Sequence, residues 1–138
     1  MTISTRTISG LGTVLVNGQG KTLYVFKPDQ AKKVTCTGPC ASVWPPVTLG
    51  SGAKPAASGG VKASLLASDP NPSGGSVVTY NGWPLYAYVA DTAPGSARGQ
   101  GVNLNGGVWY VMSPSGQPVT AKAKSSGSSS GKSGYGYP

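Results

Sequence analysis

Histidine is absent from this 138-residue sequence, and only three acidic residues stand against 11 lysines and arginines. Without histidine the chain cannot build a Ser-His-Asp or Cys-His catalytic group, a common zinc hydrolase site or a histidine-ligated haem. A structural zinc site is disfavoured as well, because the two cysteines would need two more soft or imidazole ligands. The sequence therefore predicts no cofactor and no metal, and it indicates that the protein is not an enzyme.

Long apolar runs are also missing, and no stretch approaches the ~20 residues that a membrane helix needs. Residues 1–9, MTISTRTIS, lack the apolar core of a signal peptide, so we expect an N-terminal extension behind an initiator Met. The net charge of +8 comes mostly from scattered single cations, without a nucleic-acid-binding motif. These features predict a basic protein with no transmembrane segment and no specific nucleic-acid partner.

A heptapeptide occurs twice, as LYVFKPD at residues 23–29 and as LYAYVAD at residues 85–91. Alternate side chains of a strand point to opposite faces, and here both faces are apolar, so each copy is expected near the middle of a small β structure. A single offset of 62 residues aligns the repeated positions, which are Leu23 with Leu85, Tyr24 with Tyr86, Phe26 with Tyr88, and Asp29 with Asp91.

The surroundings of the heptapeptide are repeated too. An apolar run and an Asn-Gly precede each copy, at residues 13–21 and 76–83, which predicts a hairpin. A third apolar stretch around a tryptophan follows, at residues 41–47 and 106–112. The expected fold is therefore all-β, a small sandwich or barrel of two pseudo-symmetric repeats, each a hairpin plus a Trp strand.

The domain organisation follows from this duplication. We expect one β domain over residues 10–120, with repeat one at about 10–47, a connector at 48–75 and repeat two at 76–114. Residues 121–138 are rich in Ser and Gly and predict a flexible C-terminal tail.

The two cysteines, Cys36 and Cys40, enclose Gly38-Pro39, which brings their side chains around a tight turn. A disulfide is the favoured interpretation if the protein is exported. The alternative is a redox or electron-transfer site at the same pair, although the spacing is not Cys-x-x-Cys.

Other residues allow interpretations beyond structure. Trp44, Trp83 and Trp109 are candidate contact aromatics for a ligand if they are exposed, and core residues if they are not. Asp29 and Asp91 are expected to fix turns after their strands. A hydrolase with these two aspartates as an acid/base dyad is the alternative, although neither copy carries an Asp-Thr-Gly run.

Taken together, these motifs resemble the bacterial secreted-repeat family of predicted lipoproteins. The resemblance rests on the duplicated Tyr-x-aromatic-x-x-Asp motif, the Cys-x-x-x-Cys and the Trp-Pro-Pro, and covers roughly residues 10–114. It implies an extracellular or cell-surface location and brings no settled activity. We therefore expect a non-catalytic secreted β domain with a binding or structural role, whose partner is an envelope polymer or a surface protein.

Overall fold

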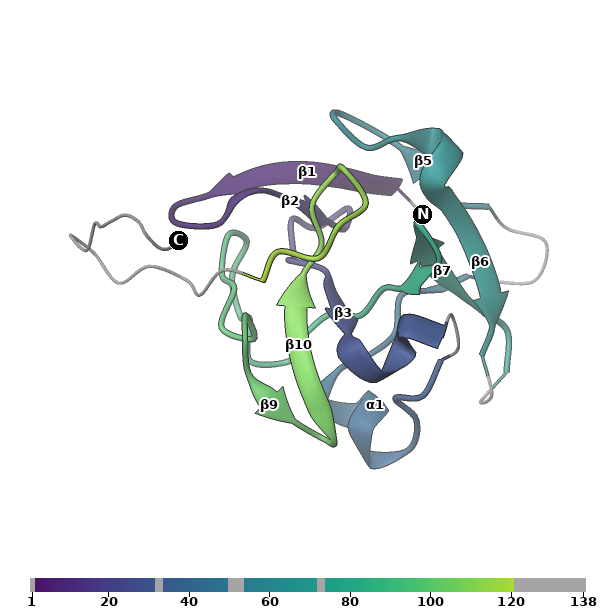
Figure 1. Cartoon of the computed structure of the whole chain (residues 1–138). Helices are drawn as coiled ribbons and strands as arrows, with labels where there is room; N and C mark the ends of the chain where they lie inside the picture. The colour runs from purple at the N-terminus through teal and green to yellow at the C-terminus, as the bar shows by residue number, and fades with distance from the viewer. Residues whose placement is uncertain (1, 32–33, 50–53, 72–73, 121–138) are drawn as a thin grey trace.

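The computed structural model describes residues 2–31, 34–49, 54–71 and 74–120, and strands dominate its regular structure (Figure 1). The C-terminal tail predicted at residues 121–138 lies outside the described residues. In chain order the elements are β1 (Thr2–Ile8), β2 (Gly12–Val16), β3 (Tyr24–Phe26), the 3-10 helix η1 (Lys27–Ala31), α1 (Pro39–Val43), β4 (Thr48–Leu49), β5 (Ala56–Ala57), the 3-10 helix η2 (Ala63–Leu65), β6 (Leu66–Pro70), β7 (Ser76–Tyr80), β8 (Trp83–Pro84), β9 (Asn103–Leu104) and β10 (Gly107–Val111).

The strands form three sheets, with strand orders β2-β1-β5, β3-β10-β9 and β4-β7-β6, and β8 pairs with β7. All pairs are antiparallel except β1 with β5, which is parallel. Helix is limited to the five residues of α1 and two short 3-10 turns in the described part of the chain. The prediction of a small all-β fold with two repeats is thus confirmed.

Each heptapeptide is preceded by an antiparallel hairpin. β1 pairs with β2 over five residue pairs, and β6 pairs with β7 over five.

Residues 2–8, which we expected to lie in an extension before the domain, are instead its first strand, and Ile3 is fully buried. The β-branched threonines and isoleucines of this stretch suit a strand, but its mostly polar character conceals the pairing.

The two predicted turns differ in length as expected. Asn81 and Gly82 form a two-residue turn with positive φ values of 52° and 82°, and Tyr80 pairs with Trp83 across it. An asparagine tolerates this left-handed conformation and a glycine adopts it freely, so the Asn-Gly sequence suits the turn. In repeat one, the Asn17 side chain instead accepts the backbone N–H groups of Gln19 and Lys21 and closes a wider turn.

The stretch around the first tryptophan departs from the prediction of a strand at residues 41–47. Residues 39–43 form α1, which has Pro39 in its first turn, where a missing N–H costs nothing. The chain then extends through Trp44 and two prolines into β4. Proline cannot donate to a ladder, so Pro45 and Pro46 limit strand pairing in this segment. The equivalent segment of repeat two, without prolines, forms the full strand β10.

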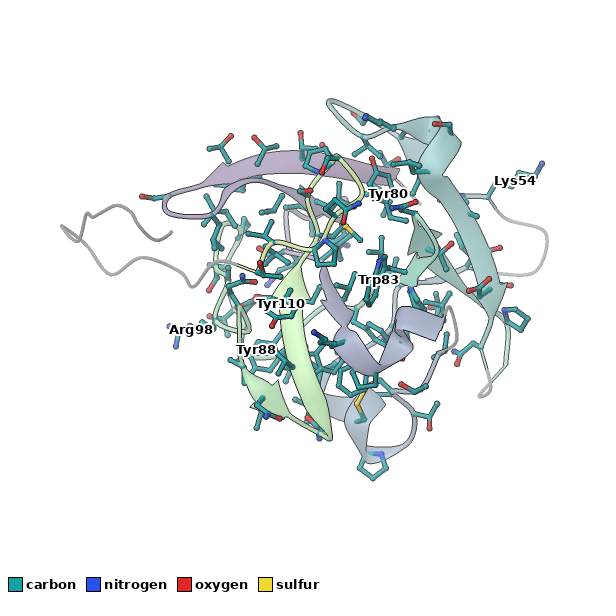
Figure 2. The ribbon with its side chains drawn as sticks, in the orientation of Figure 1. Lys54, Tyr80, Trp83, Tyr88, Arg98 and Tyr110 are labelled. Carbon is teal, nitrogen blue, oxygen red and sulfur yellow. A yellow bond between two sulfur atoms is a disulfide. The ribbon has the colours of Figure 1, made fainter. Side chains whose placement is uncertain are left out.

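The core consists of two apolar clusters that meet at the repeated strand. Tyr24 and Phe26 of β3 belong to one cluster, and their neighbours Leu23 and Val25 belong to the other, with exposed fractions of 0–3% for all four. Both faces of the strand are therefore buried, as its two-sided apolar pattern predicted. β3 pairs with β10 on one side and contacts β8, the strand that contains Trp83 (Figures 1 and 2).

The predicted disulfide is present, with a sulfur-sulfur distance of 2.01 Å between Cys36 and Cys40. The bond ties Cys36 to Cys40, the second residue of α1. We expect mild reduction to add two hydrogens to the intact mass. Replacing both cysteines with serine should lower the free energy of unfolding by about 2 kcal/mol, since the closed loop is short. An unchanged unfolding midpoint in denaturant would show that the cross-link does not constrain the unfolded chain.

Candidate functional site

The two copies of the heptapeptide lie antiparallel beside each other at the centre of the molecule. The N–H of Tyr24 donates to the carbonyl oxygen of Tyr86 at 2.7 Å, and the N–H of Tyr86 donates to that of Tyr24 at 2.9 Å. This reciprocal pair relates the two repeats by an approximate two-fold axis. The aligned positions of the duplicated motif thus become neighbours in space.

Both tyrosine side chains cross from one repeat to the other. The Tyr24 hydroxyl donates to Oδ2 of Asp91 at 2.5 Å, and the Tyr86 hydroxyl donates to Oδ2 of Asp29 at 2.6 Å. We call these two bonds the crossed pairs. A hydrogen bond to an ionised acceptor is about twice as strong as one between neutral groups. Each repeat therefore supplies the tyrosine of one pair and the aspartate of the other.

The second carboxylate oxygen of each aspartate holds the loop that follows it. Oδ1 of Asp29 accepts the N–H of Thr35 at 3.0 Å and also the hydroxyl of that threonine. Oδ1 of Asp91 accepts the N–H of Arg98 at 2.8 Å. The aspartates thus fix their turns, and the turn-fixing role expected from sequence is combined with a cross-repeat bond that the sequence did not suggest.

The tyrosine hydroxyls also accept hydrogen bonds, so each phenol both donates and accepts. Tyr24 accepts the N–H of Gly99 at 3.1 Å, and Tyr86 accepts the N–H of Cys36. Cys36 and Gly99 each directly follow the residue whose N–H binds the local aspartate. The disulfide therefore anchors the loop that encloses one crossed pair.

Glycine is needed at position 99 because the backbone there approaches two aromatic rings. A β-carbon on Gly99 would lie 2.6 Å from Cη2 and 2.8 Å from Cζ3 of Trp44, closer than real contacts of β-carbons, and it would make a tight contact of 3.0 Å with Cε2 of Tyr24. Gly99 also lies in a turn, but the close approach to the two rings is a separate reason for glycine.

The crossed pairs are excluded from solvent. Tyr24, Tyr86 and Asp29 have an exposed fraction of 0%, and Asp91 has 3%. Burial raises the pKa of the Asp29 carboxyl above its usual value, against the hydrogen bonds from Thr35 and Tyr86 that lower it. Burial is also the main cause that raises the pKa of both phenols, followed by the hydrogen bond to the carboxylate. Each carboxylate is held by partners on both repeats, and each phenol is held by two partners on the opposite repeat.

A stack of four aromatic rings, which we call the ring stack, lies beside the crossed pairs. Tyr88 stacks on Trp44 at 3.9 Å between centroids, Trp44 on Trp109 at 3.9 Å, and Trp109 on Phe26 at 4.2 Å, with planes within 20° of parallel. The order along the stack is Tyr88, Trp44, Trp109, Phe26. The two tryptophans, one from each repeat, lie at its centre. The equivalent residues Tyr88 and Phe26 lie at its two ends. The same approximate two-fold axis passes between the tryptophans.

Two of the three tryptophans that we considered as ligand contacts lie inside the ring stack. Trp44 and Trp109 have an exposed fraction of 0%, so they are core residues and do not contact a ligand at the surface. The indole N–H groups of both are bonded internally, to Oδ1 of Asn105 and to the carbonyl oxygen of Leu104. Trp83 is half-buried. Tyr88, which we had not chosen, is the half-buried end of the ring stack (Figure 2).

The two aspartates do not pair with each other. Each carboxylate is bound to a tyrosine of the opposite repeat, and neither donates to nor accepts from the other in any bond of the described residues. This is unlike an acid/base dyad, whose two carboxylates share one proton. The remaining repeated positions, Leu23 and Leu85, are fully buried in the second cluster.

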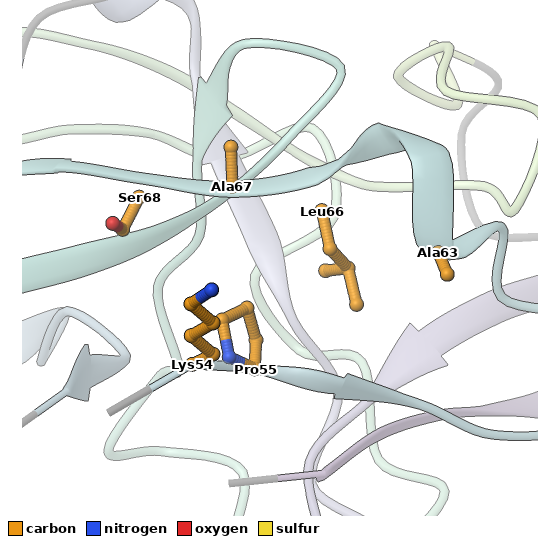
Figure 3. Close-up of a pocket in the computed structure, with 6 residues that line it drawn as sticks. All are labelled: Lys54, Pro55, Ala63, Leu66, Ala67 and Ser68. Atoms are coloured by element: carbon orange, nitrogen blue, oxygen red, sulfur yellow. The ribbon is translucent and has the colours of Figure 1, made fainter. Parts of the chain in front are cut away.

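A pocket of about 420 Å³ lies elsewhere, between the segment leading into β5 and the start of β6 (Figure 3). It is open, and Lys54 and Ser68 are its polar side chains, beside Pro55, Ala63, Leu66 and Ala67. No three of the metal-ligating side chains that the structure describes come together. In the same part of the chain, no helix is long and apolar enough to cross a membrane.

We predict that the crossed pairs can be measured by double-mutant cycles. Tyr24→Phe and Asp91→Asn should each lower the free energy of unfolding by about 1–3 kcal/mol, because each removes a buried, charge-assisted hydrogen bond. The double variant should cost clearly less than the sum, since both changes break one bond. Denaturant unfolding followed by fluorescence gives these values.

The control for this cycle uses the same substitutions within one repeat. Tyr24→Phe combined with Asp29→Asn joins residues of repeat one that share no hydrogen bond, so their costs should add. Coupling within a repeat and additivity across repeats would contradict the crossed arrangement.

A second prediction concerns alkaline pH. A raised phenol pKa in the folded state gives stability that is complete below the unfolded value of about 10 and is lost as the pH rises above it. Tyr24 and Tyr86 should therefore resist ionisation while the chain is folded, and should ionise only on unfolding. Phenolate absorbance followed alongside far-ultraviolet dichroism tests this. Ionisation of every tyrosine before any loss of structure would contradict it.

The comparisons with known proteins agree with this duplicated architecture. A family model described as a secreted repeat of unknown function matches the chain twice, at residues 5–48 and 70–113. The first match begins within β1 and the second begins at Pro70, the last residue of β6, so each match contains β2 or β7, the strand that precedes the heptapeptide. Searches of curated proteins and of solved structures give no match. The chain belongs to the family of secreted repeats of unknown function.

Proposed function

We propose that this chain acts outside the cell as a non-catalytic β domain that contacts an anionic polymer of the cell envelope. The proposal rests mainly on the burial of the acidic side chains. Two of the three acidic residues in the whole sequence, Asp29 and Asp91, are buried in the crossed pairs. The repeated motif thus builds the frame that joins the repeats, and its functional groups do not face solvent.

Because two of the three acidic side chains are buried, the exposed charges are mostly positive. Asp69 is the third acidic residue, and it is half-buried. Five cations among the described residues are exposed, namely Arg6, Lys27, Lys54, Lys62 and Arg98. In Figure 2, Lys54 and Arg98 extend from opposite sides of the molecule. Such a distributed positive surface favours loose attraction to an extended anionic chain over one defined ligand.

The extracellular location has two supports. The family is described as a secreted repeat, and the Cys36–Cys40 disulfide is of a kind that persists in oxidising compartments. We include display at the cell surface in this proposal.

Exposed apolar side chains are few in the described residues, with Val89 at 54% and Leu104 at 41% as the large ones. This is a small area for a stable protein interface.

Binding to inorganic polyphosphate, with neutral dextran as the uncharged control, tests the proposal. We expect weak binding to polyphosphate at about 0.01 M salt that fades by about 0.15 M, because screening shortens the reach of surface charges between these conditions. Lys54→Glu combined with Lys62→Glu should weaken it further, whereas Tyr88→Ala should leave it unchanged. Each variant is first shown to be folded under the conditions of the binding measurement by its far-ultraviolet dichroism.

Two results would contradict the proposal. Polyphosphate binding that survives salt and depends on Tyr88, Val89 or Leu104 would show that exposed apolar side chains, and not the distributed charge, form the binding surface. Turnover of an envelope polymer that Asp91→Asn abolishes in a folded variant would show that the domain is an enzyme.

A further inference from the structure

The segment that follows the tryptophan in each repeat, which we call the third segment, pairs with the other repeat. It lies between the strand before the Asn-Gly turn of that repeat and the heptapeptide after the turn. Val47 of repeat one lies between two strands of repeat two, since its N–H donates to Leu85 at 2.9 Å and its carbonyl accepts from Val78 at 2.8 Å. Met112 of repeat two takes the equivalent place in repeat one, donating to Leu23 at 3.3 Å and accepting from Leu15 at 2.9 Å. The two repeats thus exchange their third segments.

The side chains of the motif follow the same exchange. Phe26 of repeat one stacks on Trp109 of repeat two, and Tyr88 of repeat two stacks on Trp44 of repeat one. Both crossed pairs also join opposite repeats. A repeat that lacks its partner would therefore have no third strand in its sheet, no carboxylate for its tyrosine and no phenol for its aspartate. The surface that each repeat needs to bury is complementary to a repeat of the same kind.

We infer that each repeat recognises a repeat of its own kind, so that a second copy of this chain is a partner for it. Repeat one of one chain would close with repeat two of the other, and the reverse pair would form a second complete unit. This gives a closed dimer with two-fold symmetry in which every contact described above is kept. The inference does not depend on the binding of an envelope polymer, because it rests on the pairing between repeats alone.

The connector locates the hinge of this exchange. β5 stays with repeat one, because it pairs with β1 and the N–H of Ser58 donates to Ile3 at 2.9 Å. Lys62 already belongs to repeat two, since its N–H donates to the Tyr80 hydroxyl at 2.9 Å. Between them, the N–H of Val61 donates to Ser58 at 3.2 Å across the exposed Gly59 and Gly60, which reverse the chain.

This short turn decides between closure within one chain and closure between two. In the single chain, the covalent connection keeps the second repeat at an effective concentration on the order of millimolar, so the closed monomer dominates in dilute solution. Deleting Gly59 and Gly60 removes the two central residues of the turn. The chain then runs on in one direction and carries repeat two away from its own repeat one.

The experiment compares three forms of the full chain, namely the parent, the deletion of Gly59-Gly60, and an insertion of four Gly-Ser residues at the same point. Light scattering coupled to size exclusion should give the monomer mass for the parent and the insertion, and twice that mass for the deletion. Retained ring-stack dichroism in the deletion form would show that both units are complete. A folded monomer in the deletion form would overturn the inference.

A cross-link distinguishes exchange from association of two closed monomers. Val25 of β3 and Tyr110 of β10 are paired residues of opposite repeats. With both changed to cysteine, oxidation should join two chains in the deletion form and close a loop within one chain in the parent, as a denaturing gel without reductant shows. Val25→Cys alone is the control for random cross-links. A dimer by mass whose chains separate on that gel would overturn the inference.

The parent chain provides a test that does not require the deletion form to fold. The Val25→Cys, Tyr110→Cys chain is refolded from denaturant at increasing protein concentration and then oxidised. The fraction of chains joined in pairs should rise as the concentration approaches the effective concentration of the linked repeat. A fraction that stays at the level of the Val25→Cys control throughout would overturn the inference.

Discussion

The structure depends on one reciprocal constraint, in which two tyrosine hydroxyls bind the aspartates of opposite repeats inside the core. A buried carboxylate is tolerated when donors satisfy its oxygens, and here each aspartate receives a phenol from one repeat and a loop N–H from its own. The loops, the paired tyrosine backbones and the ring stack are all positioned around these bonds. Hydrogen bonds require a particular orientation of donor and acceptor, so these bonds fix how the core side chains are oriented. Apolar packing alone fixes mainly the volume that the side chains fill.

The same constraint explains the use of residue types along the chain. Gly99 is small because Trp44 and Tyr24 fill the space above it, and Cys36 presents its N–H to Tyr86 from a cross-linked loop. One loop is thus held by a covalent bond and the other by a close glycine contact. Equivalent positions in the two repeats perform one task through different chemistry, so the duplication is clearer in space than in sequence.

Much of the fold could be predicted because its signals are local. Asn81-Gly82 marks its turn, the alternation of Leu23, Tyr24 and Val25 predicts two buried faces, and the spacing of Cys36 and Cys40 allows a disulfide. The crossed pairs could not be predicted in this way. The equal spacing from tyrosine to aspartate in both copies indicates a shared role, but only the fold shows that the partner belongs to the other copy.

The exchange of third segments has a consequence for the composition of longer chains. A repeat leaves its sheet incomplete and its aspartate without a phenol until another repeat closes against it. Stable assemblies of this unit therefore contain an even number of repeats, whether these come from one chain or from several. Loss or gain of a single repeat would leave one unit without a partner, so genes that encode such chains should change length by pairs of repeats.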